Sequence, residues 1–237
     1  TAIEALADRL RAAKRVLVLT GAGVSVASGL STYRGDEHSV YEDEQALKDA
    51  FGSTIRKDPA GFWARFEKRR KRFRQAKPNA AHDALVVLGR RFSHFCLATQ
   101  NVDNLHSRAG SKRVVELHGN GLRERCLDEA CPQTPWRAGV SSQGLPTCPT
   151  CGQTARPDVV LFGEGDDSRW EPLRRFLAQG VDVVLLIGTS GVVPVPTQVC
   201  QLVRQHESVW IGELNPRPTD ESELKALVNA QFAFAAE

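Results

Sequence analysis

The sequence predicts an α/β protein whose core is a doubly wound parallel sheet. Three observations lead to this prediction: six short apolar runs, helical patterns between several of them, and a glycine-rich turn directly after the first run. Strands that alternate with helices favour parallel pairing, and right-handed crossovers bring the carboxyl ends of the strands to one edge. We therefore expect ligands at that edge, where open α/β sheets bind them.

The six apolar runs are rich in Val, Leu and Ile and lack a clean alternation, which is typical of strands covered on both faces. We predict strands at residues 15–20, 94–99, 113–118, 158–162, 181–188 and 209–214. We predict helices at residues 2–13, 62–76, 80–89, 168–179 and 196–206.

Two stretches interrupt this alternation. Residues 36–80 are charged and helical in pattern, and residues 121–156 contain four Cys and four Pro with little periodicity. We expect both stretches to leave the sheet and to pack together as a smaller lobe.

The composition is that of an ordinary globular protein, with 41% hydrophobic and 25% charged residues among 237. The net charge of +3 is too small to predict nucleic-acid binding, and no apolar run reaches the length of a membrane span. Residues 1–13 lack the apolar stretch of a secretion signal. We expect a cytoplasmic protein that binds neither membrane nor nucleic acid directly, with cysteines free or bound to metal.

A glycine-rich turn follows the first predicted strand. Gly21 and Gly23 could let backbone N–H groups approach a phosphate. The spacing begins like a dinucleotide-binding fingerprint, but Val26 stands where Gly or Ala is usual. Glycine is also common in such turns merely because φ must be positive, so the motif alone leaves both interpretations open.

Polar side chains follow the second predicted strand in the segment TQNVDNLH, residues 99–106. Gln100, Asn101 and Asp103 stand where the strand leaves the sheet. Buried polar groups without partners are costly, so these residues either form a turn, which Asn and Asp favour, or line a polar pocket. The segment by itself supports both alternatives equally.

His118 ends the third predicted strand and is followed by Gly119. An imidazole at this place is reachable by solvent and titrates near neutrality. A single His is more often a structural polar residue than a catalyst, but its place beside the edge at residues 100–103 makes it a candidate. The later strands end in Gly, Ser, Thr or Asn, which suits either a nucleotide or ordinary turns.

Four cysteines form two pairs, Cys126 with Cys131 and Cys148 with Cys151, and sixteen residues separate the pairs. This pattern predicts a structural zinc site with four thiolate ligands. The alternatives are four unrelated thiols or a redox pair at Cys148 and Cys151, but the Pro and Gly beside them favour a tight knuckle around a metal. Four thiolates leave no open coordination position, so we expect this zinc to hold structure rather than to catalyse.

Taken in order, these segments resemble the sirtuins, a family of NAD-dependent protein-lysine deacylases. The resemblance covers nearly the whole chain and rests on the segments TGAGVSVASGLSTYRG, TQNVDNLHSRAG, ELHGN, RPDVVLFGE, GTSGVVPVP and ELNPRPT together with the four cysteines. It implies a Rossmann-like NAD-binding domain at residues 1–35, 81–120 and 157–237, a helical module at residues 36–80 and a zinc-binding module at residues 121–156.

The resemblance also implies roles for individual residues. It makes His118 the general base and places Gln100, Asn101 and Asp103 around the nicotinamide, with Asn101 and Asp103 among the catalytic residues. It assigns the NAD diphosphate to Gly21, Ala22 and Gly23, and the cofactor loop to Tyr33 and Arg34. It assigns the adenosine side to Gly188, Thr189, Ser190 and Asn215, with Phe234 near the adenine. It also implies that an extended acyl-lysine peptide binds by strand addition. The residues that would contact this peptide are Val159, Phe162, Gly163, Glu164 and Val193.

The implied reaction begins when the acyl oxygen of a modified lysine displaces nicotinamide from C1′ of the ribose. His118 then takes a proton from a ribose hydroxyl, and the products are nicotinamide, O-acyl-ADP-ribose and free lysine. A mono-ADP-ribosyltransferase or NAD hydrolase that uses the same site is the alternative. A protein that senses NAD without turnover is a third interpretation, against which the set Asn101, Asp103 and His118 argues.

Some positions depart from the family pattern. Tyr33 replaces the usual Phe of the cofactor loop, and the short C-terminal segment makes the assignment of Phe234 insecure. The segment RPDVVLFGE looks most like the class that removes acidic acyl groups such as succinyl. That class holds the distal carboxylate with a Tyr and an Arg three residues apart, and here Phe66 and Arg69 occupy those positions. A solvated basic helix with an apolar seam is the alternative for this segment. We also expect a monomer.

Overall fold

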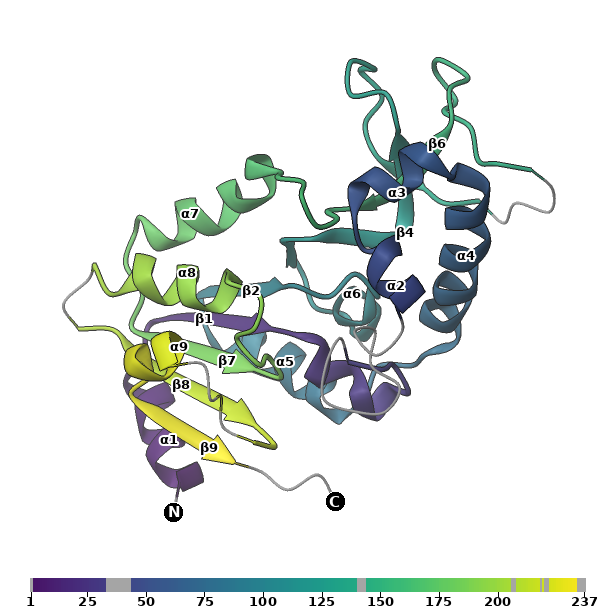
Figure 1. The fold of residues 1–237 in the computed structure, drawn as a ribbon. Coiled ribbons are helices and arrows are strands. Elements are labelled where there is room, and N and C mark those ends of the chain that lie inside the picture. The colour runs from purple at the N-terminus through teal and green to yellow at the C-terminus, as the bar shows by residue number, and fades with distance from the viewer. Residues whose placement is uncertain are drawn as a thin grey trace.

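Parallel strands form the main sheet of the computed structural model, which describes residues 2–32, 44–139, 144–205, 208–217, 219 and 222–233. Within these residues the strand order is β3-β2-β1-β7-β8-β9, and every neighbouring pair is parallel (Figure 1). The strands are β1 (Arg15–Thr20), β2 (His94–Thr99), β3 (Val115–Glu116), β7 (Val183–Ile187), β8 (Trp210–Asn215) and β9 (Ala230–Ala233). The order reverses between β1 and β7, the switch point where doubly wound sheets bind ligands. The predicted fold class is confirmed.

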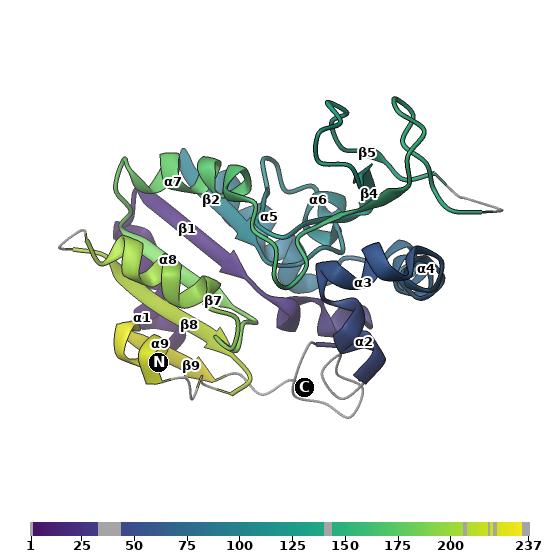
Figure 2. The ribbon, with the colours of Figure 1, turned by 45° about the horizontal axis from the view of Figure 1, so that its top comes forward.

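Helices cover both faces of this sheet, as Figures 1 and 2 show. They are α1 (Ala2–Ala12), α5 (Ala80–Arg91), α7 (Glu171–Leu177), α8 (Val195–Val203) and α9 (Ser222–Leu227). Leu17 and Leu19 of β1 pack in one cluster with α7, α8 and α9. Val16 and Val18 pack in another with α1 and α5. Because both faces of β1 are buried, its sequence lacks alternation.

A second lobe lies beside the main sheet and appears blue to teal in Figures 1 and 2. Its described elements are α2 (Glu44–Asp49), α3 (Gly52–Lys57), α4 (Pro59–Gln75), β4 (Gly119–Cys126), β5 (Trp136–Arg137) and β6 (Ala155–Val159). The strands form an antiparallel sheet in the order β5-β4-β6. Trp63 of α4 donates its indole N–H to the carbonyl of Ala155 at 2.9 Å, and the fully buried Arg70 pairs with Glu124 at 2.9 Å. The two stretches that leave the main sheet are therefore packed together, while their domain bounds stay a prediction.

The prediction of a parallel strand at residues 158–162 is wrong. The strand there is β6, which begins at Ala155 and pairs antiparallel with β4 in the second sheet. Its residues Arg156 and Asp158 are buried but paired with opposite charges. Charged residues at buried positions hid the start of this strand from the hydrophobic pattern.

Other differences concern short elements. The strand predicted at residues 113–118 is reduced to β3, and the helix predicted at residues 168–179 divides into a 3-10 turn, η2 (Asp167–Trp170), and α7. The sequence analysis does not predict α6 (Leu105–Ala109), α9 or β9, which have only five, six and four residues. Such lengths are too short for a periodic pattern to show.

None of the helices in the described residues has the length and apolar character that a bilayer crossing requires.

Candidate active site

The turns that follow β1 and β7 meet in backbone contact at the switch point. Gly21 donates its N–H to the carbonyl of Ile187 at 3.0 Å, and Gly23 donates to the carbonyl of Gly188 at 2.8 Å. A Cβ atom on Gly21 or Gly23 would stand 2.7 Å from backbone atoms of Gly188. Close packing between the two turns therefore explains these glycines. Because both N–H groups are used there, a phosphate at this turn would need other donors.

The polar segment after β2 is both a local turn and a bridge to the glycine-rich turn. Asp103 is buried, and its two oxygens accept hydrogen bonds from the Leu105 N–H at 2.8 Å and the Ser25 hydroxyl at 2.7 Å. Asn101 donates to the Gly21 carbonyl at 3.0 Å and to the Ser25 hydroxyl at 3.2 Å. The turn interpretation explains the first contact of Asp103. The contacts with Ser25 and Gly21 go further, because they fix Asn101 and Asp103 at the switch point.

His118 lies where the chain passes from the main sheet to the second sheet. β3 ends at Glu116, and Gly119 begins β4 with a φ of +84°. A Cβ atom on Gly119 would stand 2.0 Å from the Asp158 carbonyl oxygen, so this turn requires glycine. His118 Nδ1 lies 3.0 Å from the Gln100 carbonyl oxygen. Because a carbonyl only accepts, Nδ1 carries the hydrogen, and Nε2 keeps a lone pair that can take a proton.

The environment of His118 favours its neutral form. Burial lowers the pKa of His118, the Gln100 hydrogen bond raises it, and the charge of Arg169 lowers it again, so that the pKa lies below the ordinary value. The imidazole is half-buried rather than freely exposed. At neutral pH it is therefore unprotonated, which is the state that a general base needs.

A buried histidine pair lies behind the segment after β2, and sequence reasoning missed it. His106 Nε2 lies 2.8 Å from the Thr20 hydroxyl, which in turn donates to the Thr99 hydroxyl at 2.8 Å. The rings of His106 and His82 have centroids 4.8 Å apart. Burial, with a smaller contribution from His82, lowers the pKa of His106 to about 3. The sequence signal was weak, because a single His in each of two helices is common.

Because His106 is neutral in the folded protein, we expect the free energy of unfolding to decrease at acidic pH. An unfolded chain takes up a proton at an ordinary pKa of 6.5, whereas folded His106 resists protonation down to about 3. The unfolded state thus binds more protons in this window, and the free energy of unfolding falls as the pH drops through it, by about 1.4 kcal/mol per pH unit for one proton. Denaturant titrations between these pH values measure the slope.

The matched variants for this prediction are His106→Gln and His94→Gln. His94 is exposed at the start of β2, so its replacement should leave the slope unchanged. His106→Gln should reduce the slope, even though it also lowers the overall stability. An identical slope in wild type and His106→Gln would contradict the prediction.

The residues assigned to the adenosine side of NAD gather at the ends of β7 and β8. Asn215 donates to the Thr189 carbonyl at 2.7 Å and to the Glu213 carboxylate at 2.5 Å. The Gln100 amide donates to the Thr189 hydroxyl at 3.2 Å, which joins this group to the segment after β2. The Ser190 carbonyl accepts the Thr219 hydroxyl at 2.8 Å. Sequence reasoning missed Glu213, which is 1% exposed; a carboxylate inside an apolar strand was the signal that could have revealed it.

The residues assigned to a substrate peptide come from both lobes. Val159 is buried against α3 and α4, and Val193 is partly buried against the main core. Phe162 donates its N–H to the Ala50 carbonyl at 2.7 Å and accepts the Gly52 N–H at 3.2 Å. Both backbone groups of Phe162 are therefore already paired, and strand addition must use its neighbours.

The two residues that follow Phe162 have different roles. Gly163 has a φ of +82° with open space around it. Glu164 forms a two-point ion pair with Arg156, at 2.6 and 2.8 Å, and accepts the Leu161 N–H at 3.0 Å. Although burial raises the pKa of Glu164, these hydrogen bonds and charges lower it below the ordinary value. Its carboxylate thus holds the loop in shape.

The four predicted metal ligands come together in the second lobe. The Sγ atoms of Cys126, Cys131, Cys148 and Cys151 all lie within 4.8 Å of one another. Cys126 and Cys151 are 3.5 Å apart, and Cys131 and Cys148 are 3.7 Å apart. Zn–S bonds of about 2.3 Å in a tetrahedron place sulfur atoms at roughly this separation. The donor set therefore fits zinc, and the idea of four unrelated thiols is wrong.

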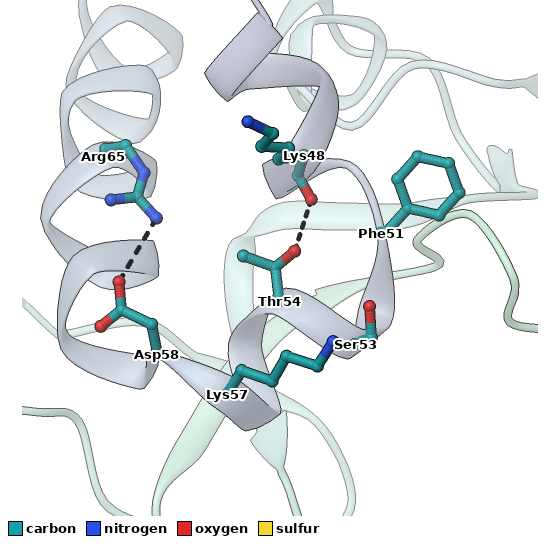
Figure 3. A pocket seen from close by; sticks show the side chains of 7 residues that line it. All are labelled: Lys48, Phe51, Ser53, Thr54, Lys57, Asp58 and Arg65. Atoms are coloured by element: carbon teal, nitrogen blue, oxygen red, sulfur yellow. Dashed lines mark hydrogen bonds and ion pairs between the residues drawn. The ribbon is translucent and has the colours of Figure 1, made fainter.

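Phe66 and Arg69, the residues predicted to contact the acyl group of the substrate, lie on α4. Phe66 is buried and stacks on Phe62 with ring centroids 5.8 Å apart, whereas Arg69 is half-buried. A hollow of about 390 Å³ lies elsewhere on this lobe (Figure 3), and its lining residues are Lys48, Phe51, Ser53, Thr54, Lys57, Asp58 and Arg65. The Arg65 guanidinium is paired with Asp49 at 2.6 Å and with Asp58 at 3.7 Å. Neither Phe66 nor Arg69 lines this hollow.

The remaining predicted NAD contacts are Ala22, which the structure describes, and three residues that it does not describe. Ala22 is half-buried at the start of η1 (Ala22–Ser28), directly after Gly21. Tyr33, Arg34 and Phe234 lie outside the described residues, so their NAD contacts stay predictions.

Comparisons with known proteins identify relatives of this chain. The sequence model described as the Sir2 family matches residues 21–195. An NAD-dependent protein deacylase of Thermus thermophilus is 43% identical over 92% of this chain and 85% of its own length. One of Corynebacterium glutamicum is 35% identical over 94% of this chain and 88% of its own length.

Solved structures show the same likeness. A mutant Sir2 homologue in complex with 2′-O-acetyl ADP ribose superposes with a TM-score of 0.85 at 32% identity, covering 98% of this chain and 91% of the other. A Sir2 homologue in complex with NAD gives a TM-score of 0.84 at 32% identity, covering 98% and 88%.

Proposed function

The chain belongs to the Sir2 family, and from this premise we propose how its residues carry out NAD-dependent protein deacylation. NAD is the cosubstrate, and a protein is the substrate class. The observation that carries the proposal is the convergence of Asn101, Asp103 and His118 on the switch point of the sheet. Bound NAD would supply an electrophilic C1′ carbon and a nicotinamide leaving group.

We assign the nicotinamide side to the segment after β2. A carboxamide needs both donors and acceptors, and Gln100, Asn101 and Asp103 offer both. Asp103 accepts two hydrogen bonds in the free protein, whereas an ionised carboxylate has about four acceptor positions. It can therefore accept the carboxamide N–H without losing Ser25. Asn101, held by the Gly21 carbonyl and Ser25, is oriented before NAD arrives.

We assign the base function to His118. Its Nδ1–H is fixed by the Gln100 carbonyl, so Nε2 is the atom that takes the proton of the ribose hydroxyl after nicotinamide has left. The hydroxyl oxygen can then attack the acyl carbon, which is joined to C1′ through the acyl oxygen, and the lysine amine leaves from that carbon. The adenosine side is assigned to Gly188, Thr189, Ser190 and Asn215. The diphosphate is assigned to the turn at residues 21–23, where donors other than the paired Gly21 and Gly23 N–H groups must bind it.

The alternative activity is mono-ADP-ribosyl transfer or NAD hydrolysis at the same site. Each would release nicotinamide but would not consume the acyl group. The test is to incubate the protein with NAD and an acyl-lysine peptide and to quantify three products. We expect nicotinamide, free lysine peptide and O-acyl-ADP-ribose in equal amounts. Nicotinamide with unchanged acyl peptide would favour the alternative.

We further propose that α4 sets the acyl preference through Phe66 and Arg69. Arg69 can pair with an acyl carboxylate through two hydrogen bonds. Phe66 lacks the phenol that would add one more, a bond to a charged group worth roughly 1.5–3 kcal/mol. We expect weak desuccinylation, with removal of neutral acyl groups retained or dominant. The measurement is kcat/KM on acetyl-, longer acyl- and succinyl-lysine peptides of one sequence.

Three variants sharpen this prediction. Phe66→Tyr should raise the succinyl-to-acetyl ratio of kcat/KM, and Arg69→Met should remove desuccinylation. Arg72→Met is the matched control, because Arg72 lies one turn along α4 and is exposed. If neither Phe66→Tyr nor Arg69→Met alters the ratio, α4 is a basic helix with an apolar seam and does not recognise the acyl group.

A further inference from the structure

We propose that Arg169 is a positioning residue of the active site, whose positive charge Asp158 and Asp166 hold beside the turn that carries His118, where it favours the neutral imidazole. The proposal deepens the function above and rests on the role of His118 as base. Arg169 belongs to η2, after the predicted substrate segment, and no motif in the sequence analysis includes it.

Two carboxylates fix the Arg169 side chain. Its Nη2 donates to Asp158 at 2.5 Å and its Nε donates to Asp166 at 2.7 Å, and only 13% of the side chain is exposed. Its Nη1 lies 3.0 Å from the place where a Cβ atom on Gly119 would stand. Gly119 directly follows His118, so the guanidinium borders the turn that carries the imidazole.

The surroundings of His118 form a chain of ion pairs. Asp158, which is 1% exposed, also accepts Arg123 Nε at 3.1 Å, and Arg123 pairs with Glu116 of β3. The charged residues on the elements and turns around His118 are Asp103, Glu116, Arg123, Glu124, Arg125, Arg156, Asp158, Glu164, Asp166, Asp167 and Arg169. Among them Arg169 is the residue whose charge lowers the pKa of His118. Asp158 and Asp166 pair with Arg169 directly, and Arg123 and Glu116 are joined to it through Asp158.

Arg169 keeps its charge throughout the titration of a histidine. Burial lowers the pKa of Arg169, but Asp158 and Asp166 raise it and prevail. A fixed positive charge disfavours an imidazolium nearby. The Gln100 carbonyl has the opposite effect, because it stabilises the protonated ring. Without Arg169, burial alone would oppose the effect of the Gln100 hydrogen bond, and a larger fraction of His118 would be protonated.

The test is an NMR titration of His118 together with the pH profile of kcat/KM for deacylation. The chain has six histidines, so the His118 signal is assigned by its loss in His118→Gln. In Arg169→Gln we expect the pKa of His118 to rise by about half a pH unit or more, the size expected for one partly screened charge. Arg169→Lys should restore a value near that of wild type. Arg174→Gln is the matched control, since Arg174 pairs with the exposed Asp167 at 3.0 Å.

A double variant keeps the test informative if Arg169→Gln alone does not fold. Arg169→Gln leaves Asp158 with one cation fewer, so the double variant Asp158→Asn with Arg169→Gln removes both charges and should show a smaller rise. An unchanged pKa of His118 in every folded variant that lacks Arg169 would overturn the proposal. If the pKa rises but the acidic limb of kcat/KM does not follow, Arg169 tunes His118 as proposed, and the assignment of His118 as the base is wrong.

Discussion

Replacing His118 with Ala should abolish deacylation while NAD still binds. The imidazole acts on a ribose hydroxyl, and its Nε2 is the atom left free by the hydrogen bond from Nδ1 to Gln100. Loss of a general base typically costs about 10²–10⁴ in rate. The affinity for NAD should change little, because Asn101, Asp103 and Asn215 remain in place. The measurements are kcat/KM on an acetyl-lysine peptide and the dissociation constant of NAD by calorimetry.

The matched control for His118→Ala is His94→Ala. His94 is exposed at the start of β2, at the opposite end of that strand from Gln100, so both constants should equal those of wild type. Product formation by His118→Ala within about tenfold of wild type would contradict the assignment of the base. Loss of NAD binding in the same variant would show instead that His118 shapes the cofactor site.

Removing zinc should unfold part of the second lobe. Metal binding by four thiolates supplies folding free energy directly, about 10–16 kcal/mol for structural zinc in finger peptides. The described parts of the loops that carry Cys131 and Cys148 are held by turn hydrogen bonds, such as the Cys148 N–H to the Gln153 carbonyl at 2.7 Å. In contrast, Trp63 and Arg70 of α4 also hold β6 and β4. Hydrogen exchange should therefore accelerate most between residues 127 and 154 after chelation, and less in β1.

A cysteine variant gives the control for this prediction. Cys148→Ser should lose the metal and lower the stability, while Cys96→Ala, which removes a buried thiol of the main sheet, should retain one zinc per chain. Elemental analysis of carefully purified protein measures the metal content directly. Wild type with no zinc, or Cys148→Ser with a full complement, would refute the four-thiolate site.

The sequence predicted best those features that are local. β1 and β2 have the predicted bounds, since an apolar run between polar turns marks a buried strand by itself. The cysteine spacing likewise predicted the cluster, because few other reasons bring two such pairs together. The resemblance to sirtuins identified the family from motifs alone, and the comparisons support it.

Features that depend on distant contacts were not predicted. β6 carries Arg156 and Asp158 at buried positions, and these are tolerated only because Glu164 and Arg169 neutralise them. The glycine-rich turn suggested a phosphate site, yet its N–H groups pair with the turn after β7, more than 160 residues further along the chain. The histidine pair behind the site also joins two separate helices. Local patterns carry no information about such partners.

The central claim is that the acyl oxygen of the substrate attacks C1′ of NAD at the edge formed by Asn101, Asp103 and His118. Its most direct test uses a peptide whose acyl carbonyl is labelled with oxygen-18, followed by mass spectrometry of the products. We expect the label in the ADP-ribose part of O-acyl-ADP-ribose, because the acyl oxygen forms the new bond to C1′. ADP-ribose that carries only oxygen from water, with the label left in the acyl peptide or in free acid, would contradict the claim.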